Sequence, residues 1–247
     1  MNFEQIVETR SNKTVYRSGN RCIKLFNKGY SKADILNEAL NQARIEETGL
    51  NIPKILEITT VDGRWALISE YIEGKSLAHI MADEPEKKEE YISLMVDIQL
   101  GIHKEKCPLL NRLKDKLDKK LADTDFDATT RYDLHNRLEA MPRGNSICHG
   151  DFSPSNIIIS EGGAPFIIDW SHATQGNAQA DAAKAYILFL LDGDRDGAEL
   201  YLGKFCEKSG LSREDISKWM PIVAAALTTE LDSAACGILD TLVNSEL

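Results

Sequence analysis

The chain has 247 residues, of which 43% are hydrophobic and 28% are charged, and its formal net charge is −10. This length allows one large domain or two lobes with separate cores. The acidic balance argues against a nucleic-acid binder, which needs a basic surface, and no apolar run is long enough to span a membrane. The five cysteines lack paired spacing and the N-terminus resembles no signal peptide, so we expect reduced thiols in a cytoplasmic protein.

The first 70 residues alternate short apolar runs with polar turns. Strands are expected over 3–9, 15–17, 22–26, 55–60 and 65–72, and a helix capped by Ser31 over 32–47. The pair Asp62-Gly63 predicts a tight hairpin between the last two strands. Lys24 lies on the third strand and Glu38 near the middle of the helix, so the two can pair if the helix packs on the sheet. We therefore predict an α+β N-terminal lobe over residues 1–70.

Residues 71–247 are mostly helical in pattern and form a predicted C-terminal lobe. After a short helix near Ser76, helical periodicity extends over 85–106, 109–121, 129–141, 181–191, 196–209, 213–220 and 221–242. One stretch interrupts these helices. There, His149-Gly150-Asp151 and Asn156 lie between two apolar runs, and a further apolar run ends at Asp169.

This interruption predicts a buried loop and a hairpin that bring Asp151, Asn156 and Asp169 into one cleft. Two carboxylates and an amide oxygen are hard oxygen ligands, which suit Mg²⁺ together with a proton acceptor. Each residue alone could simply form a turn.

Taken in order, Lys24, Glu38, the 149–156 stretch and Asp169 resemble the aminoglycoside phosphotransferase and choline kinase group. That group has the two-lobed protein-kinase-like fold. The resemblance implies transfer of a phosphoryl group from ATP to a small-molecule hydroxyl, with GTP as an alternative donor. It further implies that Lys24, fixed by Glu38, holds the nucleotide phosphates, that Asn156 and Asp169 bind Mg²⁺, and that Asp151 is the catalytic proton acceptor.

The resemblance also assigns supporting roles. His149 and Asp181 would brace the catalytic loop. The chain has no glycine-rich loop, so Ser11 and Asn12 are the expected phosphate lid, although a simple surface turn is equally expected there. The adenine would lie against the stretch 69–72, where Ser69 and Tyr71 are the expected nucleotide-binding residues.

The acceptor is the least determined part of the prediction. Only 12 positions separate Asp169 from Asp181, which leaves little room for a peptide-binding platform, so no protein substrate is expected. A small hydroxylated, cationic acceptor such as an aminoglycoside could be bound by acidic residues, for which the candidates are Asp192, Asp194, Asp196, Glu230 and Asp232. Choline, ethanolamine or a sugar is the alternative, and choline would need an aromatic box, with Trp170, Tyr186, Tyr201 and Trp219 as candidates. A third alternative is a non-catalytic nucleotide-binding pseudokinase.

Overall fold

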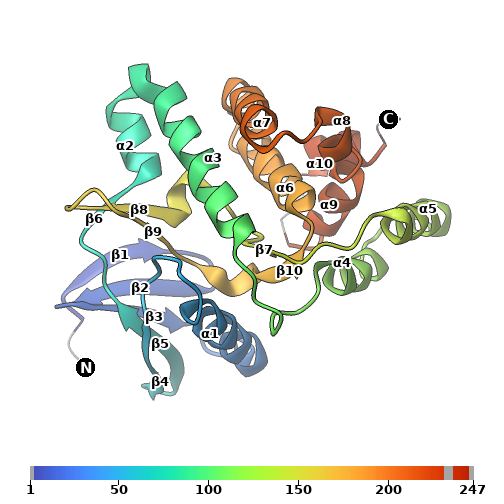
Figure 1. Cartoon of the computed structure of the whole chain (residues 1–247). Coiled ribbons are helices and arrows are strands. Elements are labelled where there is room, and N and C mark those ends of the chain that lie inside the picture. The colour runs from blue at the N-terminus through green and yellow to red at the C-terminus, as the bar shows by residue number, and fades with distance from the viewer. Residues whose placement is uncertain (1–2, 231–235, 245–247) are drawn as a thin grey trace. The chain divides into compact units, whose positions relative to one another are not determined.

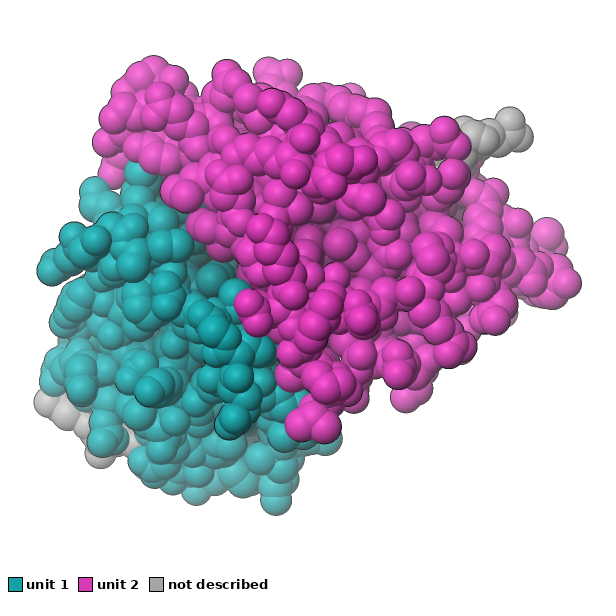
Figure 2. Space-filling view, in the orientation of Figure 1, with its two compact units in different colours: residues 1–80, 155–172 teal, residues 81–154, 173–247 magenta. Residues whose placement is uncertain are grey.

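The computed structural model describes residues 3–230 and 236–244 (Figure 1). The chain divides into two compact units, which Figure 2 distinguishes by colour. Unit 1 comprises Met1–Ile80 and Ser155–His172, and unit 2 comprises Met81–Pro154 and Ala173–Leu247. Unit 1 therefore contains a short segment from the middle of the chain, residues 155–172, in addition to the N-terminal residues. The predicted lobes, residues 1–70 and 71–247, and the functions assigned to them stay a prediction.

Unit 1 contains the predicted five-stranded antiparallel sheet, with strand order β1-β2-β3-β5-β4. Its strands are β1 Gln5–Thr9, β2 Lys13–Ser18, β3 Arg21–Phe26, β4 Ile55–Val61 and β5 Arg64–Glu70. Asp62 and Gly63, between β4 and β5, have φ values of 51° and 72°. Positive φ at both central residues is what a tight hairpin turn of the predicted kind requires.

Helix α1 (Lys32–Glu46) begins at Ser31, whose hydroxyl accepts the backbone N–H of Asp34 at 3.3 Å. The predicted cap is thus present. The helix buries Ile35 and Ala39 against Phe26 and Leu67 of the sheet. A fully buried side chain of this size contributes about 2 kcal/mol, so apolar contact fixes the helix, and Glu38 with it, beside β3.

A second sheet in unit 1 joins β6 (Gly74–Ser76), β8 (Ile157–Ser160) and β9 (Pro165–Ile167). Strands β8 and β9 form the predicted hairpin, with Ile157 opposite Ile167. A Cβ on Gly74 would lie 2.1 Å from the carbonyl oxygen of Ile159, so β6 can approach β8 only with glycine at this position.

Unit 2 is mainly helical. Short strands β7 (Ser146–Cys148) and β10 (Thr174–Gly176) pair with each other beside the helices. The helices that lie wholly within the unit are α3 Lys88–Lys104, α4 Leu113–Ala122, α5 Ala128–Ala140, α6 Ala178–Leu191, α7 Arg195–Ser209, α8 Arg213–Ser217, α9 Met220–Leu227 and α10 Cys236–Val243. Helix α2 (Leu77–Asp83) connects the two units in sequence, and short 3-10 turns occur at Pro85–Lys87, Pro154–Asn156 and Trp170–His172. None of the helices in the described ranges is long and apolar enough to cross a membrane.

Two predicted helices have different limits in the structure. The helix expected over 221–242 ends at Leu227, because the hydroxyls of Thr228 and Thr229 donate to the carbonyls of Ala225 and Ala226 at 2.7 and 2.8 Å. Hydroxyls that satisfy these carbonyls compete with continuation of the helix. Residues 231–235 of that prediction lie outside the described residues.

The helix expected over 109–121 begins only at Leu113. The side-chain amide of Gln175 donates to the carbonyls of Pro108 and Leu110, and its backbone N–H donates to Asn111. These carbonyls are engaged by a distant residue, so the segment before Leu113 stays non-helical.

Candidate functional site

Lys24 of β3 and Glu38 of α1 form an ion pair in unit 1. The Nζ atom of Lys24 lies 2.6 Å from Oε1 of Glu38, and both side chains are largely buried. The same ammonium is 3.2 Å from Oδ1 of Asp169. Burial alone would lower the pKa of Lys24, but the carboxylates of Asp169 and Glu38 outweigh it and raise that pKa. Lys24 is therefore a fixed cation between two carboxylates.

Asp169 follows strand β9 and is held in a left-handed backbone conformation, with φ of 63°. Its carboxylate also lies 3.3 Å from Nζ of Lys13 and 3.6 Å from Nη1 of Arg10. Burial would raise the pKa of Asp169, yet Lys24, Lys13 and Arg10 together hold it well below the usual range. Three cations, from β2, β3 and the turn after β1, thus converge on one buried, ionised carboxylate.

Asn156 lies at the other end of the same hairpin. It is 2% exposed, and its backbone carbonyl oxygen accepts the backbone N–H of Ile168 at 3.0 Å. Because Ile168 immediately precedes Asp169, this bond ties the backbones of the two predicted metal ligands together. Helix α1 supports the adjoining segment, where Nδ2 of Asn41 donates to the carbonyl of Ser171 at 3.3 Å.

Asn156 and Asp169 supply an amide oxygen and an ionised carboxylate, which are donors that fit Mg²⁺. Among the residues that the structure describes, no group of three or more histidine, cysteine or acidic side chains is placed to hold a metal. A pair of protein ligands is sufficient for Mg²⁺, because this ion commonly keeps waters and binds substrate phosphates. The donor set therefore fits a nucleotide-associated Mg²⁺ and does not form a complete protein cage.

The predicted nucleotide lid is a polar turn between β1 and β2. The carbonyl of Ser11 accepts Nδ2 of Asn27 at 2.8 Å, and that of Asn12 accepts the backbone N–H of Asn27 at 2.9 Å. The turn is thereby tied to the end of β3. Arg10 and Lys13 flank it and reach Asp169, which the sequence analysis missed although both cations adjoin the predicted lid.

The predicted adenine-binding stretch lies at the end of β5. Ser69 is 6% exposed, and the backbone N–H of Tyr71 donates to the carbonyl of Asn20 at 2.8 Å. The guanidinium of Arg17 lies over the Tyr71 ring, 4.4 Å from its centroid. Tyr71 is thus anchored by both its backbone and its ring, and its N–H is already engaged within unit 1.

Asp151 belongs to unit 2 and follows strand β7. Its backbone N–H donates to Nδ1 of the fully buried His149 at 3.2 Å. Gly150 has φ of 76°, and its N–H donates to Oδ1 of Asp181 at 2.8 Å. The loop that carries Asp151 is therefore fixed by the two residues that the resemblance named as braces.

Asp181 lies on α6 and makes further contacts to α3. Its Oδ2 atom is 2.9 Å from Nε2 of His103 and 3.1 Å from Nε2 of Gln99. Burial would raise the pKa of Asp181, but the contacts with His103, Gly150 and Gln99 lower it to about 2. Gln99 also accepts the hydroxyl of Tyr201. Gln99 and His103 lie within the helix predicted over 85–106, and helical periodicity alone does not reveal this network.

Several residues considered for the acceptor site have other roles. Asp194 caps α7 through the N–H of Gly197 at 2.9 Å and pairs with Lys88 at 2.6 Å. Glu230 contacts Lys120 and Lys184. Asp232 lies outside the described residues. Of the aromatic candidates, Tyr186 donates to Glu199, and Trp170, Tyr201 and Trp219 are buried in the cores.

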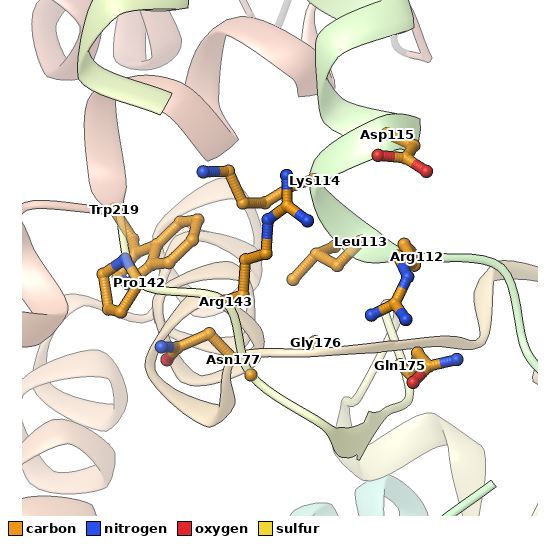
Figure 3. A pocket seen from close by; sticks show the side chains of 11 residues that line it. Arg112, Leu113, Lys114, Asp115, Pro142, Arg143, Gln175, Gly176, Asn177 and Trp219 are labelled. Carbon is orange, nitrogen blue, oxygen red and sulfur yellow. The ribbon is translucent and has the colours of Figure 1, made fainter. Parts of the chain in front are cut away.

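A pocket in unit 2 lies at the start of α4 (Figure 3). Figure 3 shows Trp219 beside Pro142 at one end and Gln175 with Arg112 at the other. The remaining lining residues are Leu113, Lys114, Asp115, Arg143, Gly144, Gly176 and Asn177. Trp219, a candidate for the aromatic box, lines this pocket, whereas none of the residues predicted for nucleotide binding, metal binding or catalysis does.

Comparison with known proteins decides the family. A family model described as the phosphotransferase enzyme family matches residues 2–213. The chain belongs to the phosphotransferase enzyme family. This membership makes it a small-molecule phosphotransferase and confirms the resemblance drawn from the sequence. A comparison with curated proteins finds no significant match.

Solved structures of known proteins share the fold of this chain. An aminoglycoside phosphotransferase APH(4)-Ia mutant, in a ternary complex with ADP and hygromycin B, has 16% sequence identity and a TM-score of 0.70, with 100% of this chain and 95% of that chain covered. An aminoglycoside-3'-phosphotransferase of type VIII has 15% identity and a TM-score of 0.67, with 91% and 93% covered. Choline kinase LicA from Streptococcus pneumoniae has 17% identity and a TM-score of 0.62, with 100% and 88% covered. At these identities the likeness confirms the predicted kinase-like fold alone.

Proposed function

We propose that this family member transfers the γ-phosphoryl group of ATP to a hydroxyl group of a small organic molecule. The observation that carries the proposal is the buried set in unit 1, where Lys24 lies between Glu38 and Asp169. Phosphoryl transfer depends on positioned charges more than on covalent help from the protein. A fixed ammonium beside a permanently ionised carboxylate provides such charges.

The unit 1 residues would bind the nucleotide. Lys24 would hold the α- and β-phosphates, with Glu38 fixing its ammonium, and Ser11 and Asn12 would form the lid. Arg10 and Lys13 are added to this set, because their charges lie beside the same carboxylate. The base would lie near Ser69 and Tyr71, where backbone contacts would admit GTP as well as ATP.

Asn156 and Asp169 would hold Mg²⁺, which when bound would neutralise charge on the phosphates. Asp151 would act in unit 2 by accepting or orienting the proton of the acceptor hydroxyl. The braces from His149 and Asp181 support this role, because a general base must be held in position. ATP and thiols outside disulfides, such as those of Cys22 and Cys206, are typical of the cytoplasm, where we propose that the enzyme works.

For the acceptor, the names of the solved relatives favour aminoglycosides first and choline second. Both are cations. Growth of a host that expresses the chain on hygromycin B, together with ADP release in the presence of hygromycin B, choline, ethanolamine or sugars, tests these classes. Binding of ATP without turnover of any acceptor would favour the pseudokinase alternative.

The substitution Asp151→Ala tests the catalytic assignment. We expect kcat to fall by about a hundredfold to ten-thousandfold, the usual contribution of a general base, while MgATP binding measured by calorimetry is retained. Asp118→Ala is the control, because Asp118 is an exposed carboxylate of the same unit. Activity of the Asp151 variant near that of the control would contradict the assignment.

A further inference from the structure

The pocket at the start of α4 lies wholly within unit 2 and has a closely packed wall. It holds about 320 Å³ of space, part of it open to solvent, which is at the lower end of small-molecule sites. A Cβ on Gly144 would lie 2.1 Å from the carbonyl oxygen of Gly176, and a Cβ on Gly176 would lie 2.4 Å from that of Leu113. Because two glycines allow this close approach, the pocket is formed by the fold itself.

The lining of the pocket is positively charged, although the chain as a whole has a formal net charge of −10. Its charged side chains are three cations and one carboxylate: Arg112, Lys114, Arg143 and Asp115. The ammonium of Lys114 is engaged, because it donates to the carbonyls of Glu139 and Met141 at 3.0 Å each. The guanidinium groups of Arg112 and Arg143 make no hydrogen bond or ion pair with the residues that the structure describes, so both are free to bind an anion.

Helix α4 begins at the pocket without a side-chain cap, because Arg112 occupies the N-cap position and makes no cap hydrogen bond. The first N–H groups of a helix have no acceptor within the helix. Those of Lys114 and Asp115 make no hydrogen bond within residues 3–230 and 236–244. The positive end of the helix dipole adds to the charge of the arginines here.

Trp219 gives independent evidence that the pocket accepts a polar group. Its side chain is 1% exposed and lines the pocket (Figure 3), and its indole N–H makes no hydrogen bond in the described part of the chain. This nitrogen is not among the fully enclosed polar atoms that lack a partner, so the small exposed part of Trp219 includes it. A nearly buried donor without an acceptor is costly, and an oxygen atom in the pocket would satisfy it.

We propose that this pocket binds the oxyanion of a small molecule, a phosphate or a carboxylate group. Arg112 and Arg143 supply the charge, and Trp219 and the first turn of α4 supply N–H donors. An occupant would lie against β10, which pairs with β7 directly before the loop that carries Asp151. It would also lie against Asn177, whose side chain caps α6 by accepting the N–H of Gln179 at 2.9 Å. The site is therefore separate from the proposed nucleotide, metal and catalytic residues but adjoins the elements that support the catalytic loop.

The first experiment compares small probes of opposite charge. Binding of inorganic phosphate, benzoate and choline to the full chain without nucleotide is measured by calorimetry and by tryptophan fluorescence. We expect both anions to bind and choline, a cation, not to bind, and the tighter anion identifies the group as phosphate or carboxylate. The fluorescence change should be lost in Trp219→Phe and retained in Trp65→Phe, because Trp65 lies in unit 1. Binding of choline, or of neither anion, would overturn the proposal.

The second experiment changes the charge of the lining. We expect Arg112→Gln and Arg143→Gln to raise the Kd for the anion about tenfold or more, as loss of a charge-assisted contact does. Arg195→Gln, at an exposed position of unit 2 outside the pocket, should leave the Kd unchanged. Asp115→Asn should lower the Kd about two- to fivefold, because the carboxylate that opposes an anion is removed. Thermal unfolding of each variant separates a local effect from loss of the fold.

Phosphate could instead bind in unit 1, where Lys24 is proposed to hold the phosphates of the nucleotide. Lys24→Gln should therefore retain anion binding if the pocket is the site. Loss of binding in Lys24→Gln together with normal binding in Arg112→Gln and Arg143→Gln would place the anion in unit 1 and overturn the proposal.

Amide hydrogen exchange locates the bound anion without any substitution. Saturating phosphate or benzoate should slow exchange over residues 113–116 and 175–179, which border the pocket, as read by mass spectrometry. Slower exchange confined to other segments, or no change at all, would mean that the anion binds elsewhere and would overturn the proposal. None of these measurements uses an acceptor or turnover, so their failure would leave the proposed function intact, and absence of phosphoryl transfer would leave this site intact.

Discussion

Asp169 combines an unusual backbone with an unusual electrostatic environment. Its φ of 63° is a conformation that a residue with a side chain adopts at a cost of about 1 kcal/mol or more. Three cations contact its carboxylate. Strain of this kind persists only where surrounding contacts impose it. The residue is therefore held ionised and in a fixed orientation beside Asn156.

We expect Asp169→Asn to weaken Mg²⁺-dependent nucleotide binding by about tenfold or more, because a charged metal ligand is replaced by a neutral one. Calorimetric titration of ATP with and without Mg²⁺ measures this. Asp62→Asn is the matched control, since Asp62 also has a positive φ but lies in an exposed turn. Equal Mg²⁺ dependence in the two variants would show that Asp169 is not a ligand.

The buried contact of Lys13 could not be predicted from the sequence. A lysine that begins a strand after a polar turn has the same pattern as a solvated one, and only its contact with Asp169, 156 positions away, buries it. Lys24 was easier to identify, because the sequence allows it to pair with Glu38 if the helix packs on the sheet, and the two side chains do pair.

We expect Lys13→Gln to raise the KM for ATP about tenfold, because a buried cation that contacts Asp169 beside Lys24, the lysine proposed to bind phosphate, is lost. Steady-state kinetics over a range of ATP concentrations measures the change. Lys28→Gln, at an exposed position of the same unit, should leave KM unchanged. If the two variants behaved alike, Lys13 would have no role in nucleotide binding.

Helices α3 and α6 and the loop after β7 are joined by one carboxylate, that of Asp181. The loop that carries Asp151 thus depends on two helices at once. A lowered carboxyl pKa stabilises the folded state above the ordinary value of 3.8, and this stabilisation is lost as the pH falls toward about 2.

We expect Asp181→Asn to lower the free energy of unfolding at pH 7 by about 3 kcal/mol, because hydrogen bonds to a buried carboxylate are lost. The difference from wild type should shrink as the pH falls below 3.8. Urea unfolding across this pH range measures both effects. Asp133→Asn on α5, where the carboxylate is 55% exposed and pairs with Arg137, should change stability by less than about 1 kcal/mol. If Asp181→Asn lost no more stability than Asp133→Asn, Asp181 would not brace the loop that carries Asp151.

At the element scale, the sequence predicted the long strands, α1 and the β8–β9 hairpin because each has a clear hydrophobic period or turn signal. It did not predict β6, β7 or β10, which have three residues each and therefore no measurable period. The end of α9 and the start of α4 depend on hydroxyls and on a distant glutamine. Such contacts exist only after the chain has folded.

Across the whole molecule, the residues proposed to bind nucleotide and metal lie in unit 1, whereas Asp151 lies in unit 2. Residues 155–172, which carry Asn156 and Asp169, join unit 1 from the middle of the chain. A fragment that ends at residue 80 would therefore lack both residues that we propose to bind Mg²⁺.

MgATP should raise the thermal stability of the full chain, because a ligand that binds only the folded state adds about 2.7 kcal/mol at one hundred times its Kd. Scanning calorimetry with ATP and Mg²⁺, or with ATP and EDTA, measures this. We expect the shift in Tm to be reduced by EDTA and in Asp169→Asn, and to be retained in Asp151→Ala. A full shift in the presence of EDTA would argue against a role for the metal.

The left-handed backbone at Asp169 also limits how this position can change during evolution. Only glycine, asparagine and aspartate adopt such a conformation readily. A lineage that no longer needed catalysis could replace the carboxylate by asparagine or glycine and keep its fold, whereas valine or isoleucine would add backbone strain to the loss of charge. We therefore expect relatives that have lost activity to carry asparagine or glycine here, so that this single position records whether selection for phosphoryl transfer has been relaxed.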